Sequence, residues 1–510
     1  MSKKIIFITI LAVLLIGFIF VATRPSSNQS QQSQASVTPD SLYIYNQSAP
    51  PASQNPKYLT FQLGSGPDDN GFLGNPVSKD EFAASVQGII DAIGTTGTAQ
   101  NKFGFVIGPL AFEHTDEQVR QMIRDGFAIA KEKNVSVGFH IDDSMFWRRR
   151  QDLYVKKENI EWIDWNGRLN TGRKIDWGKP IKLAPQMCLN SVAIQNEVQQ
   201  RAKIIGDEIE KELYNLKAIG KEELFAGVIA GWETQLGRDF DTDKSLGYCA
   251  LTNKGFSASN PPKDIDQERE KIVQEFINLW AKSIAKAGIP KEKIYSHVAF
   301  MSKKEFDELK KQNPQFSFSY SQLMNFATAP AAFGQFHNPG FSTYPAVGLF
   351  PQIYDELIKN NNTSWASSEG TNIAIGSISG EDTMETYLAR MFNHGATLVN
   401  IFAWGVGGEN GRNNPFRIGT ERKEALAAYK KFLSGKRLKE SPLPKEYGII
   451  AKVHRIQREL PIWLKNGGDN KKAGPLLENM FKYIQENNPW KAEEYADELL
   501  KLLKQNKYKK

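Results

Sequence analysis

The chain has 510 residues, of which 40% are hydrophobic and 24% are charged, as in ordinary globular proteins. Its formal net charge of +7 comes largely from the two ends, with Lys3 and Lys4 at one end and five lysines among the last ten residues at the other. Nucleic-acid binding requires basic side chains clustered on one face. Only the short run Arg148–Arg150 is clustered in the body of the chain, so we expect no nucleic-acid partner.

The N-terminal segment predicts a membrane anchor. Lys3 and Lys4 precede Ile5–Ala22, which are 18 residues without a charge and can span a bilayer. Because basic residues stay on the cytoplasmic side, we expect residues 1–23 to form a signal anchor that holds the rest of the chain outside the cytoplasm. A cleaved signal peptide, which would give a secreted protein, is the alternative. Residues 24–56 are rich in Ser, Gln, Asn and Pro and predict a flexible linker.

A regular alternation of short β-branched or aromatic runs with helical periodicity extends from residue 57 to about residue 435. The expected strands are Tyr58–Leu63, Phe103–Ile107, Val135–Asp142, Phe225–Glu233, Ile294–Phe300, Gly340–Tyr344, Ser364–Glu369 and Leu398–Trp404. The expected helices are Asp80–Ile93, Asp116–Lys133, Val192–Tyr214, Asp266–Ala287, Lys303–Gln312, Leu349–Asn360, Met384–His394 and Arg422–Leu433. Eight such units predict an α/β fold, a (β/α)8 TIM barrel over residues 57–435. A doubly wound open sheet is less consistent, because no G-x-G-x-x-G follows the first strand.

Residues 436–510 predict a C-terminal helical domain with a structural role. Apolar residues recur at helical spacing in three segments, and Asn, Gly and Pro residues separate these segments. The expected helices are Tyr447–Leu464, Pro475–Gln485 and Lys491–Leu503.

The two cysteines, Cys188 and Cys249, follow the third and fourth strands. In an oxidising compartment they could form a disulfide bond, and two isolated buried thiols are the alternative. The chain contains no CxxC or HxxxH spacing, so we expect neither a metal nor an organic cofactor.

Two glutamates follow strands that face each other across the mouth of the expected barrel. Glu233 ends the run Gly227–Glu233 on the fourth strand, and Glu369 ends Trp365–Glu369 on the seventh. Glycosidic bonds are usually cut by two carboxylates, one of which protonates the leaving oxygen. In retaining enzymes the second attacks the anomeric carbon from about 5–5.5 Å away. The positions of these residues predict a catalytic pair.

This placement resembles the large clan of retaining barrel glycosidases that includes β-galactosidases, cellulases and mannanases. The resemblance implies that Glu233 is the acid/base and Glu369 the nucleophile. It also implies that Tyr344, on the sixth strand, hydrogen-bonds the nucleophile and that Trp404, on the eighth, lies under the sugar. One departure is Trp232, because the clan usually has Asn before the acid/base residue.

Further residues are candidates for binding the carbohydrate substrate. His140 and Asp142 end the third strand and could bind sugar hydroxyls or form a polar network at the barrel rim. Trp147 and other indoles occupy the long loop after that strand, where they could stack on sugar rings or form a small core under the loop. We also include Trp232, beside Glu233, among the substrate-binding residues.

The prediction is therefore a retaining glycosidase that acts on an extracellular oligosaccharide or polysaccharide. A non-catalytic surface barrel that binds carbohydrate is the alternative, and it predicts that Glu233 and Glu369 do not converge. A metal-dependent barrel hydrolase is a third possibility, and it requires ligands that converge at the barrel mouth.

Overall fold

The computed structural model describes residues 56–64, 73–176, 180–343, 349–371, 383–402, 423–440, 449–485 and 489–505. Its main sheet has eight parallel strands in the order β7-β6-β3-β2-β1-β10-β9-β8. The strands are β1 (Lys57–Leu63), β2 (Asn101–Leu110), β3 (Ser136–Ile141), β6 (Phe225–Ala230), β7 (Ile294–Ser296), β8 (Gly340–Ser342), β9 (Trp365–Thr371) and β10 (Ala396–Phe402). Each of the eight expected strands corresponds to one of these.

The two end strands of this order, β7 and β8, also pair with each other and close the sheet into a barrel. Parallel bridges join Tyr295 to Asn338 and Val298 to Phe341. The amide of Ser296 donates to the carbonyl of Asn338, and the amide of Ser342 donates to the carbonyl of Val298. The prediction of a (β/α)8 TIM barrel is therefore confirmed. In such a barrel the carboxyl ends of all eight strands meet at one rim.

The interior of the barrel contains an apolar layer and a polar layer. Side chains alternate along a strand, so every second residue points inward. One cluster of buried apolar residues comes from seven positions on six strands, namely Tyr58, Val106, Ala226, Ile229, Tyr295, Ala366 and Leu398. Further along the strands the buried inner residues are polar, and they include Gln62, His140 and Asn400. The polar layer therefore lies toward the rim where the two glutamates are found.

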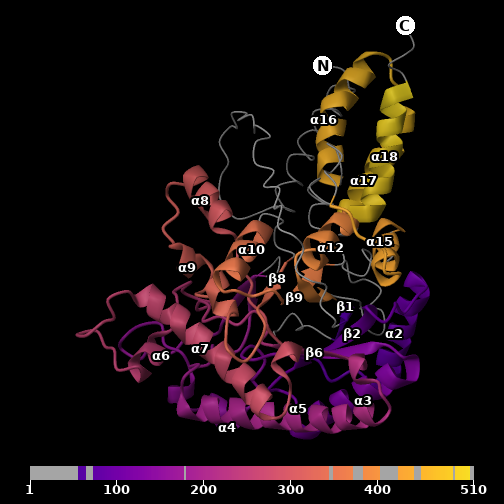
Figure 1. Cartoon of the computed structure of the whole chain (residues 1–510). Helices are drawn as coiled ribbons and strands as arrows, with labels where there is room; N and C mark the ends of the chain where they lie inside the picture. The colour runs from indigo at the N-terminus through magenta and orange to yellow at the C-terminus, as the bar shows by residue number, and fades with distance from the viewer. Residues whose placement is uncertain are drawn as a thin grey trace.

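Helices surround the barrel and bury their apolar faces against the outer residues of the strands (Figure 1). They are α2 (Lys79–Ile93), α3 (Asp116–Lys133), α5 (Val192–Ala218), α7 (Ile265–Lys286), α10 (Leu349–Lys359), α12 (Met384–Phe392) and α15 (Lys423–Leu433). An eighth helix, α8 (Lys303–Gln312), packs its Phe306 against Phe316 and Tyr320 of the segment that follows it. The boundaries of the helices follow from local chemistry. Capping boxes start α2 at Ser78 and α3 at Thr115, and such a cap typically contributes about 1 kcal/mol.

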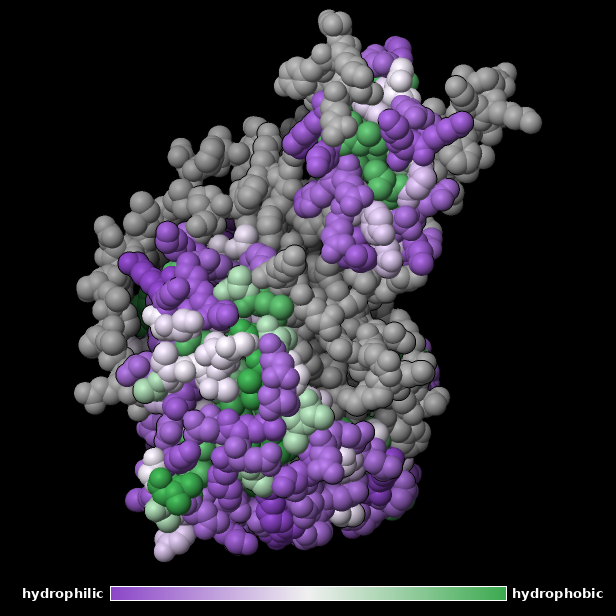
Figure 2. Space-filling model, turned by 90° about the vertical axis from the view of Figure 1, so that its right-hand side faces the viewer, coloured by the Kyte–Doolittle hydropathy of each residue, from purple (hydrophilic) through white to green (hydrophobic). Residues whose placement is uncertain are grey.

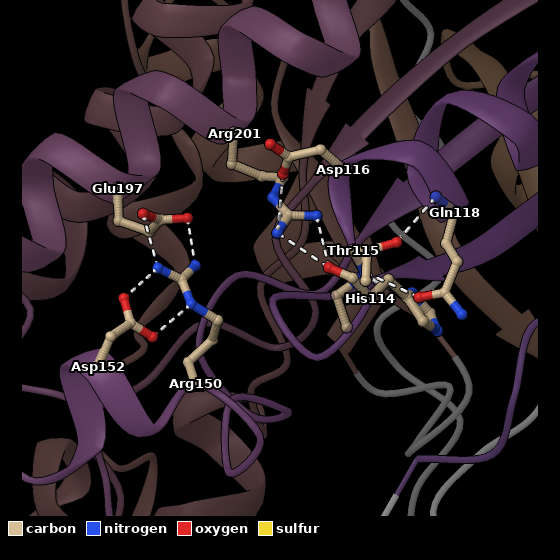
Figure 3. A network of polar contacts seen from close by, with 9 residues as sticks. His114, Thr115, Asp116, Gln118, Arg150, Asp152, Glu197 and Arg201 are labelled. Carbon is tan, nitrogen blue, oxygen red and sulfur yellow. Dashed lines mark hydrogen bonds and ion pairs between the residues drawn. The ribbon is translucent and has the colours of Figure 1, made fainter.

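The loop that follows β3 is an excursion that contains α4 (Gln151–Tyr154) and the two-stranded ribbon of β4 (Lys174–Asp176) and β5 (Pro180–Lys182). Two buried or half-buried arginines connect α5 (Val192–Ala218) to the loops after β3 and β2 (Figure 3). Arg150 forms ion pairs with Asp152 of α4 and with Glu197 of α5. Arg201, also on α5, donates two hydrogen bonds of 3.0 Å to the carbonyl of His114.

Three helices form a bundle after the barrel, as expected for the C-terminal region: α16 (Ile449–Lys465), α17 (Asn470–Gln485) and α18 (Pro489–Gln505). They have an apolar core separate from that of the barrel. The bundle stands at the top of Figure 1, and Figure 2 shows a strip of hydrophobic residues along it between hydrophilic ones. The prediction that the second helix begins at Pro475 is wrong, because α17 begins five residues earlier and includes this proline.

The expected signal anchor, residues 1–23, and most of the expected linker lie outside the described residues. Among the helices that the structure describes, none is long and apolar enough to cross a membrane.

Candidate active site

Glu233 and Glu369 lie at the carboxyl-terminal rim of the barrel and reach it in different ways. The fourth strand, β6, ends at Ala230, so Glu233 lies in the turn that follows rather than in the strand, as had been expected. Glu369 lies inside β9, two residues before the strand ends at Thr371. Both side chains are buried.

The two carboxylates converge on a histidine that the sequence analysis did not identify. One oxygen of Glu233, one oxygen of Glu369 and a ring nitrogen of His297 all lie within 4.8 Å of one another. His297 follows β7, and its Nε2 lies 3.4 Å from Oε2 of Glu369. Ser342, at the end of β8, links the group, because its hydroxyl lies 2.8 Å from Nε2 of His297 and donates to Oε1 of Glu233 over 3.4 Å.

His297 is backed by a second histidine of the barrel interior. Nε2 of His140 lies 3.0 Å from Nδ1 of His297 and 2.9 Å from the carbonyl oxygen of Gly231. Burial lowers the pKa of His297 to about 3 and holds the pKa of His140 well below its usual range. Both imidazoles are therefore neutral near pH 7, so His297 interacts with Glu369 as a polar group and not as a cation.

The backbone that presents Glu233 has a conformation that side chains rarely adopt. Glu233 has φ 51°, and Gly231, two residues earlier, has φ 114°. A non-glycine residue in this region costs on the order of 1–3 kcal/mol and persists only where its surroundings hold it. Asp143 helps to hold this backbone conformation. Its carboxylate accepts hydrogen bonds from the amide of Trp232 and the hydroxyl of Thr234.

Arg173 supplies a buried cation next to this carboxylate. The side chain is 1% exposed, and its guanidinium interacts electrostatically with Asp143, Asp142 and Glu233. Burial raises the pKa of Asp142 to about 7, with a contribution from Asp143, and burial also raises the pKa of Asp143. The arginine opposes both shifts, so this cluster of charges is compensated within the protein.

Two of the predicted substrate-binding residues stack on each other. The rings of His140 and Trp232 lie 4.3 Å apart between centroids at an interplanar angle of 6°. His140 is fully buried, and its Nδ1 lies 3.1 Å from Oε1 of Gln62. This arrangement is the polar rim network that was the alternative for His140. A contact of Trp232 with substrate stays a prediction.

Asp142 and Trp147 are also fully buried, and their polar atoms are engaged within the protein. The carboxylate of Asp142 accepts hydrogen bonds from the amides of Met145, at 3.0 Å, and Phe146, at 2.7 Å. The indole N–H of Trp147 donates to the carbonyl of Pro185. These contacts favour a structural role for both residues, because hydrogen bonds to backbone already satisfy them. Tyr344 and Trp404 lie outside the described residues.

The loops after β3 and β6 are joined along one side of the site. Cys188 and Cys249 form a disulfide with Cα atoms 5.9 Å apart, which confirms the predicted pairing. Glu161, which is fully buried, accepts hydrogen bonds from the amides of Gly247, Cys249 and Ala250 at the start of α6 (Tyr248–Asn253). Burial raises the pKa of its carboxyl to about 7.

Three aspartates of the loop after β6 bind side chains of the loop after β3. Oδ1 of Asp239 accepts a hydrogen bond of 3.1 Å from the hydroxyl of Thr171, Asp241 pairs with Lys182 at 3.0 Å, and Asp243 pairs with Lys174 at 3.0 Å. These acids therefore connect the two loops.

Within the described ranges, one group of side chains has the composition and spacing to hold a metal ion. It consists of Glu233, His297 and Glu369. Two carboxylate oxygens and an imidazole nitrogen are ligands that Zn²⁺ and related ions accept. The expectation that the site needs no metal therefore stays a prediction.

The architecture resembles those of several solved glycosidases. The catalytic domain of β-amylase from Paenibacillus polymyxa aligns with 76% of this chain and 100% of its own length, at 9% identity and a TM-score of 0.44. A GH5-4 broad specificity endoglucanase from an uncultured bacterium aligns with 73% of this chain and 93% of its own, at 9% identity and a TM-score of 0.37. A glycoside hydrolase family 5 enzyme from Prevotella bryantii B14 aligns with 74% and 95%, at 10% identity and a TM-score of 0.33. No protein-family model and no curated protein sequence matches the chain.

Proposed function

We propose that this protein is a retaining glycoside hydrolase that acts on an extracellular oligosaccharide or polysaccharide. The observation that carries the proposal is the convergence of Glu233 and Glu369, whose carboxylate oxygens approach within 4.8 Å. Oxygens this close are compatible with the separation of about 5–5.5 Å between the carboxyl groups of retaining enzymes.

In this proposal the two carboxylates have different roles. Glu233 protonates the glycosidic oxygen as the leaving group departs, and Glu369 attacks the anomeric carbon to form a covalent glycosyl-enzyme. Glu233 then removes a proton from the water that hydrolyses this intermediate. Burial of both side chains supports the assignment, since a water-excluded site strengthens the electrostatic interactions on which these steps depend.

The proposed location is outside the cytoplasm. The apolar segment Ile5–Ala22 supports export, and the disulfide between Cys188 and Cys249 is the kind of bond that persists in oxidising compartments. We propose that the N-terminal segment either anchors the protein in the cell membrane or is removed to give a secreted form.

The non-catalytic carbohydrate-binding barrel is less consistent with the site, because that alternative predicts glutamates that do not converge. One specific observation favours a second candidate. Glu233, His297 and Glu369 together could bind a divalent metal ion, and the chain would then be a metal-dependent hydrolase in which the ion activates water.

The test is a screen of aryl glycosides and surface polysaccharides with the purified protein, followed by proton NMR of the first anomer released. The proposal expects a product with the configuration of the substrate. An inverted product would reject Glu369 as a nucleophile. Absence of hydrolysis across the screen, with saturable binding of an oligosaccharide, would favour the binding barrel.

A further inference from the structure

The turn that carries Glu233 is held from both sides by a single side chain. Oδ1 of Asp143 accepts a hydrogen bond of 3.2 Å from the amide of Trp232, the residue before the glutamate. Oδ2 accepts one of 2.6 Å from the hydroxyl of Thr234, the residue after it. Asp143 and Thr234 are fully buried, so water does not compete for these bonds.

Two further contacts reach the turn from the barrel interior, because Nε2 of His140 lies 2.9 Å from the carbonyl oxygen of Gly231 and the amide of Glu233 donates to Nδ1 of His297 over 3.3 Å. A Cβ atom at Gly231 would lie 2.5 Å from Oγ1 of Thr234, so the hydroxyl fits closely against the glycine backbone. Glu233 itself has φ 51°, and local preference would return it to a negative φ. Rotation about this φ would swing the side chain away from Ser342 and His297, since the direction of the Cα–Cβ bond follows the backbone.

The carboxylate of Asp143 is kept in place by the neighbouring loop. Arg173 is buried beside it, and its guanidinium attracts Asp143 more strongly than it attracts Asp142 or Glu233. Nη1 of the arginine donates to the hydroxyl of Ser144 over 3.4 Å. Arg173 belongs to the loop after β3, and its backbone forms an antiparallel β-bridge with that of Asp239 in the loop after β6, so both loops fix the position of this counter-charge.

We propose that Asp143 is a positioning residue for the acid/base Glu233, acting through Trp232 and Thr234. The expected loss of activity rests on the proposed function, whereas the expected change in the conformation of Glu233 does not. Asp143 does not need to touch the substrate. It holds the backbone conformation that directs the carboxylate of Glu233 toward Glu369.

The test removes the hydroxyl of Thr234 that donates to Asp143. Valine in its place keeps the charge and, closely, the shape of the side chain. Thr234→Val removes the hydroxyl, Thr234→Ser keeps it, and Thr234→Ala is the second variant should valine not fit. Because a displacement of about 1 Å at a catalytic group can cost on the order of 100-fold, we expect Thr234→Val to lower kcat by about 10- to 100-fold with KM little changed. Thr234→Ser is expected to retain most of the activity.

Thr328 offers a matched control, because it is a buried threonine whose side chain makes no capping hydrogen bond with the short helix η4 (Ala329–Ala332) that it precedes. Thr328→Val is expected to leave kcat unchanged. A kcat of Thr234→Val within about twofold of the wild-type value would overturn the proposal. Equal losses for the serine and valine variants would do the same, since the hydroxyl would then not matter.

A crystal structure of Thr234→Val gives a readout that needs no substrate. The proposal expects Glu233 to leave the positive-φ region and its carboxylate to move away from Ser342, and an unchanged Glu233 would overturn it. If the wild-type protein cleaves no glycoside and this movement is still observed, the proposed function fails while the positioning role stands.

Discussion

Nε2 of His297 faces Oε2 of Glu369 at 3.4 Å, although the burial that lowers the pKa of this histidine to about 3 leaves it uncharged. A neutral imidazole near the carboxylate provides a polar contact without the strong attraction of a cation. In the proposed mechanism this environment suits Glu369, because an ion pair would stabilise the free carboxylate and slow its attack on carbon.

The first prediction separates the roles of the two glutamates. Glu369→Gln should lose nearly all turnover, because an amide cannot form the glycosyl-enzyme. Glu233→Gln should keep activity on aryl glycosides whose leaving groups need no protonation, and azide should accelerate it because azide needs no general base. Steady-state kinetics of both variants with and without azide measure this difference. Identical behaviour of the two variants would show that the role assignment is wrong.

The second prediction concerns the three potential metal ligands. If the carboxylates act as acid/base and nucleophile, dialysis against EDTA should leave kcat/KM unchanged, and added Zn²⁺ should inhibit because it occupies Glu233, His297 and Glu369. A metal-dependent hydrolase would lose activity on dialysis and recover it with the ion. His297→Gln serves as the control, since inhibition by Zn²⁺ should weaken in this variant.

The third prediction concerns the disulfide between Cys188 and Cys249, which are 61 residues apart. Closing a loop of that length removes chain entropy worth about 4 kcal/mol from the unfolded state. We expect the double variant Cys188→Ser/Cys249→Ser to unfold at lower urea concentration than the oxidised wild type. Dithiothreitol should lower the midpoint of the wild type only. Two reactive thiols in unreduced wild-type protein would contradict the bond.

The fourth prediction concerns stability at acidic pH. His337 is fully buried, and burial lowers its pKa to about 4. The unfolded chain, with a histidine pKa of about 6.5, therefore binds the proton first as the pH falls, and unfolding becomes easier between about pH 6.5 and 4. In this range the unfolded state binds up to one more proton than the folded state. The free energy of unfolding therefore falls by up to about 1.4 kcal/mol per pH unit as the pH is lowered.

The variant His337→Gln should remove this contribution. Its free energy of unfolding, measured by urea titration at several pH values, should fall less steeply than that of the wild type below pH 6.5 and run parallel to it above that value. Parallel curves across the whole range would show that the buried histidine is not the source of the pH dependence.

The barrel and its pair of glutamates could be predicted because both depend on local patterns. Apolar runs followed by helical periodicity mark each strand–helix unit, and parallel strands bring their carboxyl ends to one rim. Glu233 and Glu369 therefore converge once their strands are counted correctly. The direction of the Glu233 side chain was not predicted, because this residue lies in the turn after β6, three residues beyond the end of the strand at Ala230.

His297 and Asp143 could not be found in this way. His297 follows β7, a strand of only three residues, and its partners come from β3, β8 and β9, which are distant in sequence. Asp142 and Asp143 are adjacent and chemically identical. Only the direction of each side chain determines which of the two holds the turn at Glu233. Trp147 shows the same limit, since the carbonyl of Pro185, 38 residues away, accepts its indole N–H.

The disulfide, the hydrogen bonds of Glu161 and the contacts of Asp239 join the loop after β3 to the loop after β6 at several points. We expect a change in the length of either loop to displace the other, and such a displacement to reach Asp143 through Arg173. We therefore expect homologous proteins to vary these two loops together. A graft that exchanges one loop between homologues should fail where exchange of both succeeds.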